Sequence, residues 1–70
     1  MSVKTSQHIG TQLKKYRTQH GLTQAALAQI AGTNINYYAK LERGIAVPSL
    51  AMLEKLVVAL EVRSSDILPF

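Results

Sequence analysis

Apolar residues recur along this chain at intervals of three and four positions, as on one face of an α-helix. No segment shows the β-branched enrichment or the alternation of a strand. Gly21, Gly32 and Gly44 separate the helical stretches, and glycine readily takes the left-handed conformation in which helices end. The pattern therefore predicts an all-α fold.

Five helices are expected, over residues 6–20, 24–31, 33 or 34 to 43, 49–60 and 64–68. Their main apolar positions are Ile9, Leu13, Tyr16, Leu27, Ala28, Ile30, Ala31, Leu50, Leu53, Leu56, Val57 and Leu60. Thr23 is a good N-cap for the second helix, and the small Ala28 lets the third helix approach the second closely. Two short helices joined by a glycine turn predict a helix-turn-helix unit.

Length and composition fit one small domain over residues 1–70, with a core of about residues 7–68. The chain is 47% hydrophobic and has no cysteine, so neither a disulfide framework nor thiolate zinc ligation is expected. Such a short chain buries only about 60% of the surface exposed on unfolding, so dimerisation is an expectation from size alone. No apolar run approaches the roughly 20 residues of a membrane span, and a cytoplasmic location is expected.

Positive charge is concentrated in the first part of the chain. The net charge is +4, yet residues 1–41 hold five basic residues and no acidic one, whereas residues 42–70 carry a net −1. A polyanion such as nucleic acid would therefore bind the first part.

The segment TNINYYAKLERG, residues 33–44, has two faces of different character. At about 100° per residue, its polar face consists of Thr33, Asn36, Tyr37 and Lys40. The other face turns Tyr38 and Leu41 toward the core, with the Tyr38 hydroxyl at the edge of the core and Ile35 at the margin.

Two opposite charges lie on inward helix faces. Arg17 follows Leu13 by four residues, and Glu42 follows Tyr38 by four. An unpaired buried charge costs far more than a buried pair, so we expect an ion pair between Arg17 and Glu42 that ties the first helix to the third.

The third helix also carries residues suited to DNA. A helix fits the major groove, where asparagine can pair with adenine, lysine with guanine and an apolar group with the thymine methyl. Asn34, Ile35, Asn36 and Lys40 are the expected base-contacting set. Either asparagine alone is more simply a polar residue on a solvated face, but two such poor helix formers in one turn need a reason.

Enzymatic activity is not expected. His8 and His20 have no acidic neighbour, and the sequence shows no nucleophile with an adjacent base, no metal-ligand cluster and no cofactor site.

Two consecutive segments, GLTQAALAQIAG and TNINYYAKLERG, carry a pattern of seven residues: Gln24, Ala28, Gly32, Tyr38, Leu41, Glu42 and Gly44. A third segment, VPSLAMLEKLVVALEV, follows them. On these segments the span from Ile9 to Leu68 resembles the DNA-binding domain of the phage lambda repressor and Cro family, the XRE-like helix-turn-helix proteins. The resemblance implies a compact five-helix domain in which the second and third helices form the helix-turn-helix. It also implies a transcriptional regulator, a repressor that binds a palindromic operator as a homodimer.

By position, the resemblance implies that Gln24 holds a DNA phosphate, aided by the helix dipole. It implies that Thr33, Tyr37 and Arg43 face bases or backbone at the rim of the interface.

The chain also departs from the family. Ala25 and Ala26 stand where a glutamate is common, and residues 45–47 are apolar where basic residues are common, so that loop should contribute less to phosphate binding. Glu61 takes the place of a helix-ending glycine, at a cost of about 1 kcal/mol.

The chain end, DILPF, has two alternative roles. Ile67, Leu68 and Phe70 either pack against their own helices or form a homodimer contact that sets two recognition helices about one DNA turn apart. Three settings fit equally: a repressor of a mobile element, a restriction-modification controller and the antitoxin of a toxin–antitoxin pair. The alternative from another class is a protein-interaction module, or an antitoxin subunit, whose main partner is a toxin or another protein; steep salt dependence would favour DNA.

Overall fold

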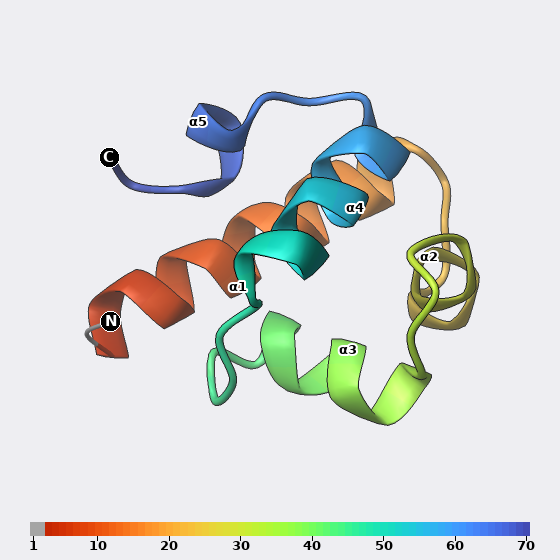
Figure 1. Cartoon of the computed structure of the whole chain (residues 1–70), viewed down its shortest axis with the longest axis horizontal. Coiled ribbons are helices and arrows are strands. Elements are labelled where there is room, and N and C mark those ends of the chain that lie inside the picture. Colours follow the sequence, from red (N-terminus) through yellow and green to blue (C-terminus); the bar gives the residue numbers. More distant parts are fainter. Residues whose placement is uncertain (1–2) are drawn as a thin grey trace.

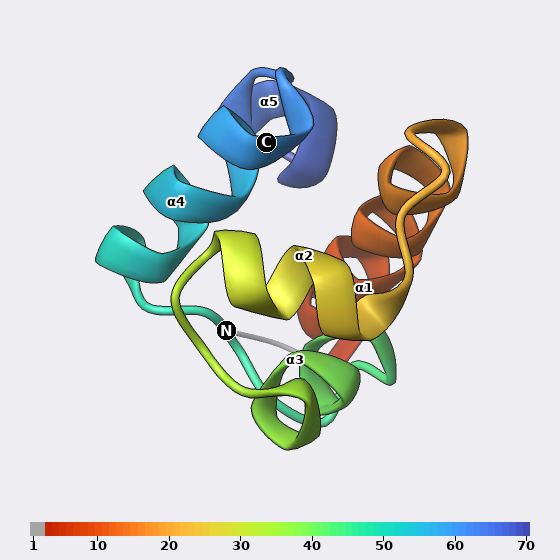
Figure 2. The same cartoon turned by 90° about the vertical axis from the view of Figure 1, so that its right-hand side faces the viewer.

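The computed structural model describes residues 3–70, which form five helices and no strand. The helices are α1 (Val3–Gln19), α2 (Gln24–Ile30), α3 (Ile35–Glu42), α4 (Leu50–Leu60) and α5 (Ser64–Ile67). Figure 1 shows α3 below α1 and α5 above it, and Figure 2 shows α4 and α1 on opposite sides of α2. The predicted all-α fold of five helices is confirmed.

One apolar core joins the helices. α1 packs against α3 and α5, whereas α2 packs against α3 and α4. The buried apolar residues are Ile9, Leu13, Leu27, Ala28, Ala31, Tyr38, Leu41, Leu53, Leu56, Leu60 and Ile67. Because α3 contacts both α1 and α2, its inner face is fixed from two sides and its outer face stays free.

Local signals place the ends of the helices. Thr23, Asn34 and Ser49 each cap a helix, since the side-chain oxygen accepts a hydrogen bond from the backbone N–H three residues further on. Gly32, with φ of 75°, makes the turn from α2 to α3. Glu61 ends α4 with φ of 57°, so the strained turn expected there is present.

A glycine inside α1 lets α1 and α3 touch through their backbones. A Cβ at Gly10 would lie 2.5 Å from the carbonyl oxygens of both Leu41 and Glu42. Any larger residue at position 10 would therefore push the end of α3 away from α1. This contact was not predicted from the sequence.

Several expected details were wrong. α1 begins at Val3 and not near Ser6, because Ser6 is buried within the helix and its hydroxyl donates to the Val3 carbonyl. Ile30 and Leu50 are not core residues: they are 58% and 84% exposed, because no element packs over that side of α2 or of the first turn of α4. α5 ends at Ile67, one residue before the expected end.

Candidate nucleic-acid interface

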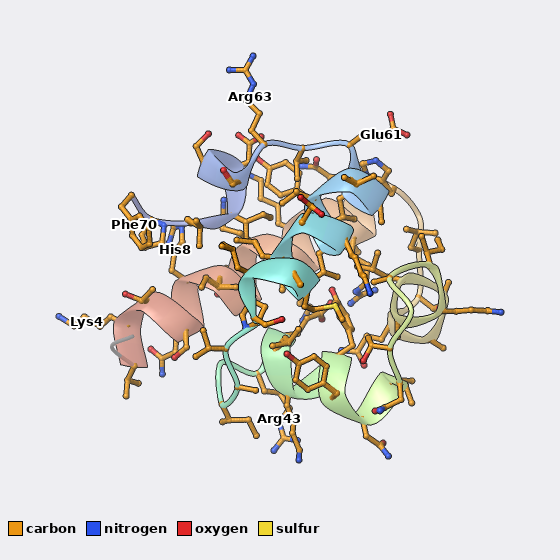
Figure 3. The ribbon with its side chains drawn as sticks, in the orientation of Figure 1. Lys4, His8, Arg43, Glu61, Arg63 and Phe70 are labelled. Atoms are coloured by element: carbon orange, nitrogen blue, oxygen red, sulfur yellow. The ribbon has the colours of Figure 1, made fainter. Side chains whose placement is uncertain are left out.

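The outer face of α3 carries most of the residues predicted to meet DNA. Asn36, Lys40 and Arg43 are exposed, and Ile35 is 46% exposed at the start of the helix. Figure 3 shows Arg43 projecting away from the body of the molecule at the α3 side. A polar and basic helix face with one apolar residue matches the donor, acceptor and methyl pattern of the major groove.

Thr33, Asn34 and Tyr37 lie differently from these exposed residues. Thr33 and Tyr37 are half-buried, and Tyr37 packs partly against the core. Asn34 is exposed, but its Oδ1 accepts a hydrogen bond of 2.8 Å from the backbone N–H of Tyr37. Its carboxamide oxygen is therefore engaged as the cap of α3, which fixes the side chain and turns its amide nitrogen, a donor, to other contacts.

A buried ion pair holds the inner side of this unit. Arg17 Nε lies 2.5 Å from Glu42 Oε2, and the two side chains are only 12% and 3% exposed. The Tyr38 hydroxyl donates to the same oxygen, and Arg17 Nη1 donates to the Leu22 carbonyl at 2.8 Å. The ion pair expected between Arg17 and Glu42 is present and joins α1, the turn before α2, and α3.

These contacts shift the ionisation of all three groups. Burial alone would raise the pKa of Glu42, but hydrogen bonds from Arg17, Tyr38 and Gln24 lower it overall. The hydrogen bond to Glu42 raises the pKa of Arg17, and burial followed by the contact with Glu42 raises the pKa of Tyr38. The pair is therefore ionised, and Tyr38 keeps its proton, around neutral pH.

Gln24, the residue implied to hold a phosphate, is also part of this network. It is half-buried at the first position of α2, and its Nε2 lies 3.0 Å from Glu42 Oε1. One side of its carboxamide is thus held toward the inside by Glu42, a contact that was not predicted from the sequence.

Sequence reasoning missed two structural features of this unit. The Tyr38 hydroxyl lies inside the core on the Glu42 carboxylate and not at its edge, because Tyr38 is fully buried. The close approach at Gly10 was missed as well. A glycine in the middle of a helical pattern was the available signal, since glycine weakens a helix unless packing requires it.

The loop after α3 is apolar on the outside. Ile45 is 61% exposed and Val47 40% exposed, close in sequence to the exposed Arg43. This arrangement offers a DNA backbone fewer positive charges than a basic loop would, as expected from the sequence.

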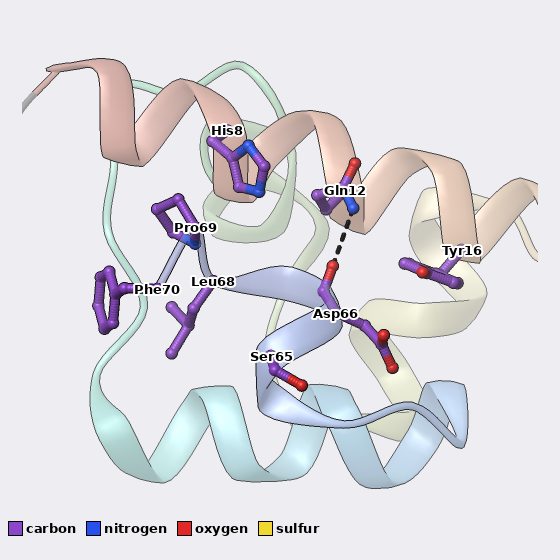
Figure 4. A pocket seen from close by; sticks show the side chains of 8 residues that line it. All are labelled: His8, Gln12, Tyr16, Ser65, Asp66, Leu68, Pro69 and Phe70. Carbon is purple, nitrogen blue, oxygen red and sulfur yellow. Dashed lines mark hydrogen bonds between the residues drawn. The ribbon is translucent and has the colours of Figure 1, made fainter.

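Two grooves lie away from α3. One, of about 400 Å³, lies between α1 and residues 65–70; its lining includes His8 and Tyr16 of α1, Ser65 of α5 and Phe70 after α5 (Figure 4). The dashed line in Figure 4 marks the hydrogen bond of 2.8 Å from Gln12 Nε2 to the Asp66 carbonyl that joins the two walls. The second groove, of about 240 Å³, is lined by Leu50, Leu53, Glu54, Val57 and Ser64.

Residues 3–70 contain neither a cluster of metal-binding side chains nor a helix that could span a membrane. No group of three or more His, Cys, Asp or Glu side chains is placed to hold a metal ion. None of the helices in this part of the chain has the length and apolar character needed to cross a membrane.

Comparison with known proteins agrees with this geometry. Residues 13–67 match the model of a helix-turn-helix family. The HTH-type transcriptional regulator SinR of Bacillus subtilis is 36% identical over 55 residues, which are 77% of this chain and 50% of SinR. The chain thus spans about half the length of the curated relatives it matches.

Solved structures share the fold. The restriction-modification controller protein C.AhdI from Aeromonas hydrophila superposes with a TM-score of 0.84 at 32% identity, over 89% of this chain and 94% of that one. An HTH_3 family transcriptional regulator from Vibrio cholerae gives a TM-score of 0.85 at 34% identity, over 93% of this chain and 36% of that chain. These proteins are transcriptional regulators and a controller protein, the class of protein that the sequence resemblance implied.

Proposed function

Because this chain belongs to the helix-turn-helix family of DNA-binding transcriptional regulators, we propose that it inserts α3 into the major groove of double-stranded DNA. The observation that carries the proposal is the free outer face of α3, where Asn36, Lys40 and Arg43 are exposed together. We treat residues 7–68 as the core of a single DNA-binding domain.

Base recognition is assigned to the first turns of α3. Asn36 pairs with adenine through both atoms of its carboxamide, Lys40 donates to guanine, and Ile35 contacts a thymine methyl. Asn34 contributes mainly its amide nitrogen, because its oxygen already accepts the hydrogen bond that caps the helix. Asn36 is therefore the main adenine-reading residue of the proposal.

Backbone contacts surround this set. Gln24 at the start of α2 donates to a phosphate, while Thr33, Tyr37 and Arg43 contact the sugar–phosphate chain or base edges at the rim. Arg43 is the one charged member, so it should contribute most to the salt dependence of binding.

We further propose that the protein acts as a repressor and binds a palindromic operator as a homodimer. Of the two alternatives for Ile67, the dimer contact is excluded, because the side chain is fully buried in the core of its own chain. Leu68 is half-buried and Phe70 is 77% exposed, so they remain the contact residues of the α5 region. A pair of such chains would present two copies of α3 about one DNA turn apart.

The biological setting is left among three alternatives. C.AhdI is a restriction-modification controller, and its similarity supports that role for this chain. The other two alternatives are a mobile-element repressor and an antitoxin. The exposed Ile45 and Val47 favour a second candidate function, in which a toxin or another protein binds this end of the unit.

The proposal is tested by selecting bound duplexes from a random DNA pool and then titrating salt against binding of the enriched sequence. We expect a palindrome with half-site centres about 10 base pairs apart and binding that weakens steeply as salt rises. If no sequence is enriched and binding stays weak, the outer face of α3 is a protein-binding surface.

A further inference from the structure

The carboxylate of Glu42 connects the buried ion pair to the residue proposed to hold a phosphate. Its Oε1 accepts hydrogen bonds from Arg17 Nη2 at 3.1 Å and from Gln24 Nε2 at 3.0 Å. The Glu42 side chain is 3% exposed, whereas Gln24 is half-buried. The Gln24 carboxamide therefore contacts the buried network on one side and lies at the surface of α2 on the other.

We infer that Glu42 is a positioning residue, which fixes the Gln24 carboxamide for a phosphate of the DNA backbone; this inference rests on the function proposed above. A carboxylate only accepts hydrogen bonds, so Gln24 must turn its amide nitrogen and not its oxygen toward Glu42. That nitrogen carries two hydrogens, and only one of them donates to Oε1. The second hydrogen remains for an acceptor at the surface.

The surrounding contacts hold this arrangement in place. Arg17 Nη1 donates to the Leu22 carbonyl, and Thr23 caps α2, so the backbone just before Gln24 is fixed relative to α1. Glu42 is the last residue of α3, the helix proposed to read the bases. The network therefore sets the distance between the phosphate contact on α2 and the base-contacting face of α3.

Preorganisation is the physical benefit. A glutamine already held in one rotamer has lost its side-chain entropy on folding, so binding DNA does not need to order it. Without Glu42 the carboxamide would sample other rotamers, and its oxygen as well as its nitrogen could face the phosphate.

A double-mutant cycle measures the coupling. Affinity for a duplex of about 20 base pairs is measured by fluorescence anisotropy for Gln24→Met, Glu42→Gln and the double variant, at a temperature where each is folded. We expect Gln24→Met to weaken binding about tenfold without changing the salt slope, because the amide is uncharged. Glu42→Gln should weaken binding about fivefold, and the double variant should lose no more than Gln24→Met alone. Losses that multiply would overturn the inference.

Two matched controls separate positioning from folding. Gln29→Met removes an exposed glutamine on the other side of α2 and should leave affinity unchanged. Tyr38→Phe removes a hydrogen bond to the other oxygen of Glu42, so it should lower the melting temperature yet keep affinity. If Tyr38→Phe weakens binding as much as Glu42→Gln, the role of the network is only structural and the inference fails.

Side-chain amide exchange gives an answer even if Glu42→Gln does not fold. In the wild-type protein, one amide proton of Gln24 should exchange with water more slowly than those of the exposed Gln29, and its geminal partner should shift when the duplex is added. Equal exchange for the two glutamines would overturn the inference. A wild-type protein that binds no duplex would instead refute the proposed function itself.

Discussion

Replacing Gly10 by alanine adds one methyl group at the closest contact between α1 and α3. The new Cβ would lie 2.5 Å from the carbonyl oxygens of Leu41 and Glu42 and 2.9 Å from the carbonyl carbon of Glu42. All three atoms belong to the backbone, so no side-chain rotation can relieve the contact. The end of α3 must therefore move by roughly 0.9 Å to restore an ordinary contact of 3.4 Å.

The magnitude follows from two opposing effects. Alanine in place of a helical glycine stabilises a helix by about 0.5–1 kcal/mol, whereas overpacking of a close contact costs about 1–3 kcal/mol. Because the atoms that must move are backbone atoms, we place the overpacking cost at the upper end and expect a net loss of about 2 kcal/mol. Total stability for 70 residues is about 3.5–10 kcal/mol, so this loss is a large fraction of it.

Thermal unfolding followed by circular dichroism measures this loss. For a domain of this size, about 2 kcal/mol corresponds to a fall in the melting temperature of roughly 8–16 °C. DNA affinity of the folded variant should also fall, because the displaced atoms end the helix that carries Lys40 and that Arg43 directly follows. An unchanged or raised melting temperature would refute the close approach, since helix propensity alone predicts a gain.

Arg17→Met should destabilise the fold by about 3 kcal/mol, because it leaves the Glu42 carboxylate buried without its cation; an unchanged melting temperature would refute this. Folding lowers the pKa of Glu42 from its ordinary value of 4.5. The ionised Glu42 therefore stabilises the fold fully above pH 4.5, and this stabilisation is lost as the pH falls through the lower pKa of the folded state. Melting temperatures between pH 6 and about 3 should show this loss, and Glu42→Gln should reduce it. Glu61→Gly should stabilise by about 1 kcal/mol in denaturant unfolding, since φ there is 57°; destabilisation would contradict the strained turn. Asn36→Ala should cost about 1–3 kcal/mol at one base pair of the operator, whereas Arg43→Ala should weaken all duplexes alike and lower the salt slope by about 1. Equal losses on specific and random duplexes for Asn36→Ala would refute its role in base recognition.

Sequence reasoning succeeded where the cause is local. Thr23 caps α2 through the N–H three residues further along, and Gly32 makes the following turn, so each signal acts within one turn of chain. The ion pair between Arg17 and Glu42 was also predictable, because helical spacing turned both charges inward and a buried charge needs a partner.

The failures concern which surfaces become covered. Ile30 and Leu50 have the same apolar character as the core residues, yet both are exposed, because no other helix packs over them. Ile67 had two alternative roles, a dimer contact or packing within its own chain, and only the structure shows that it is fully buried in the core of its own chain. Periodicity identifies an apolar face but not the element that will cover it.

The sequence by itself determined the five helices, the caps of α2, α3 and α4, the helix-turn-helix unit and the polar outer face of α3, since these depend on spacing and on caps a few residues away. Only the tertiary structure decided that Gly10 meets the end of α3, that the Tyr38 hydroxyl joins the ion pair, and that Gln24 is held by Glu42. Gly10 and Glu42, and likewise Gln24 and Glu42, are well separated in the chain. Their contact is set by how α1, α2 and α3 pack, and not by any local preference of the backbone.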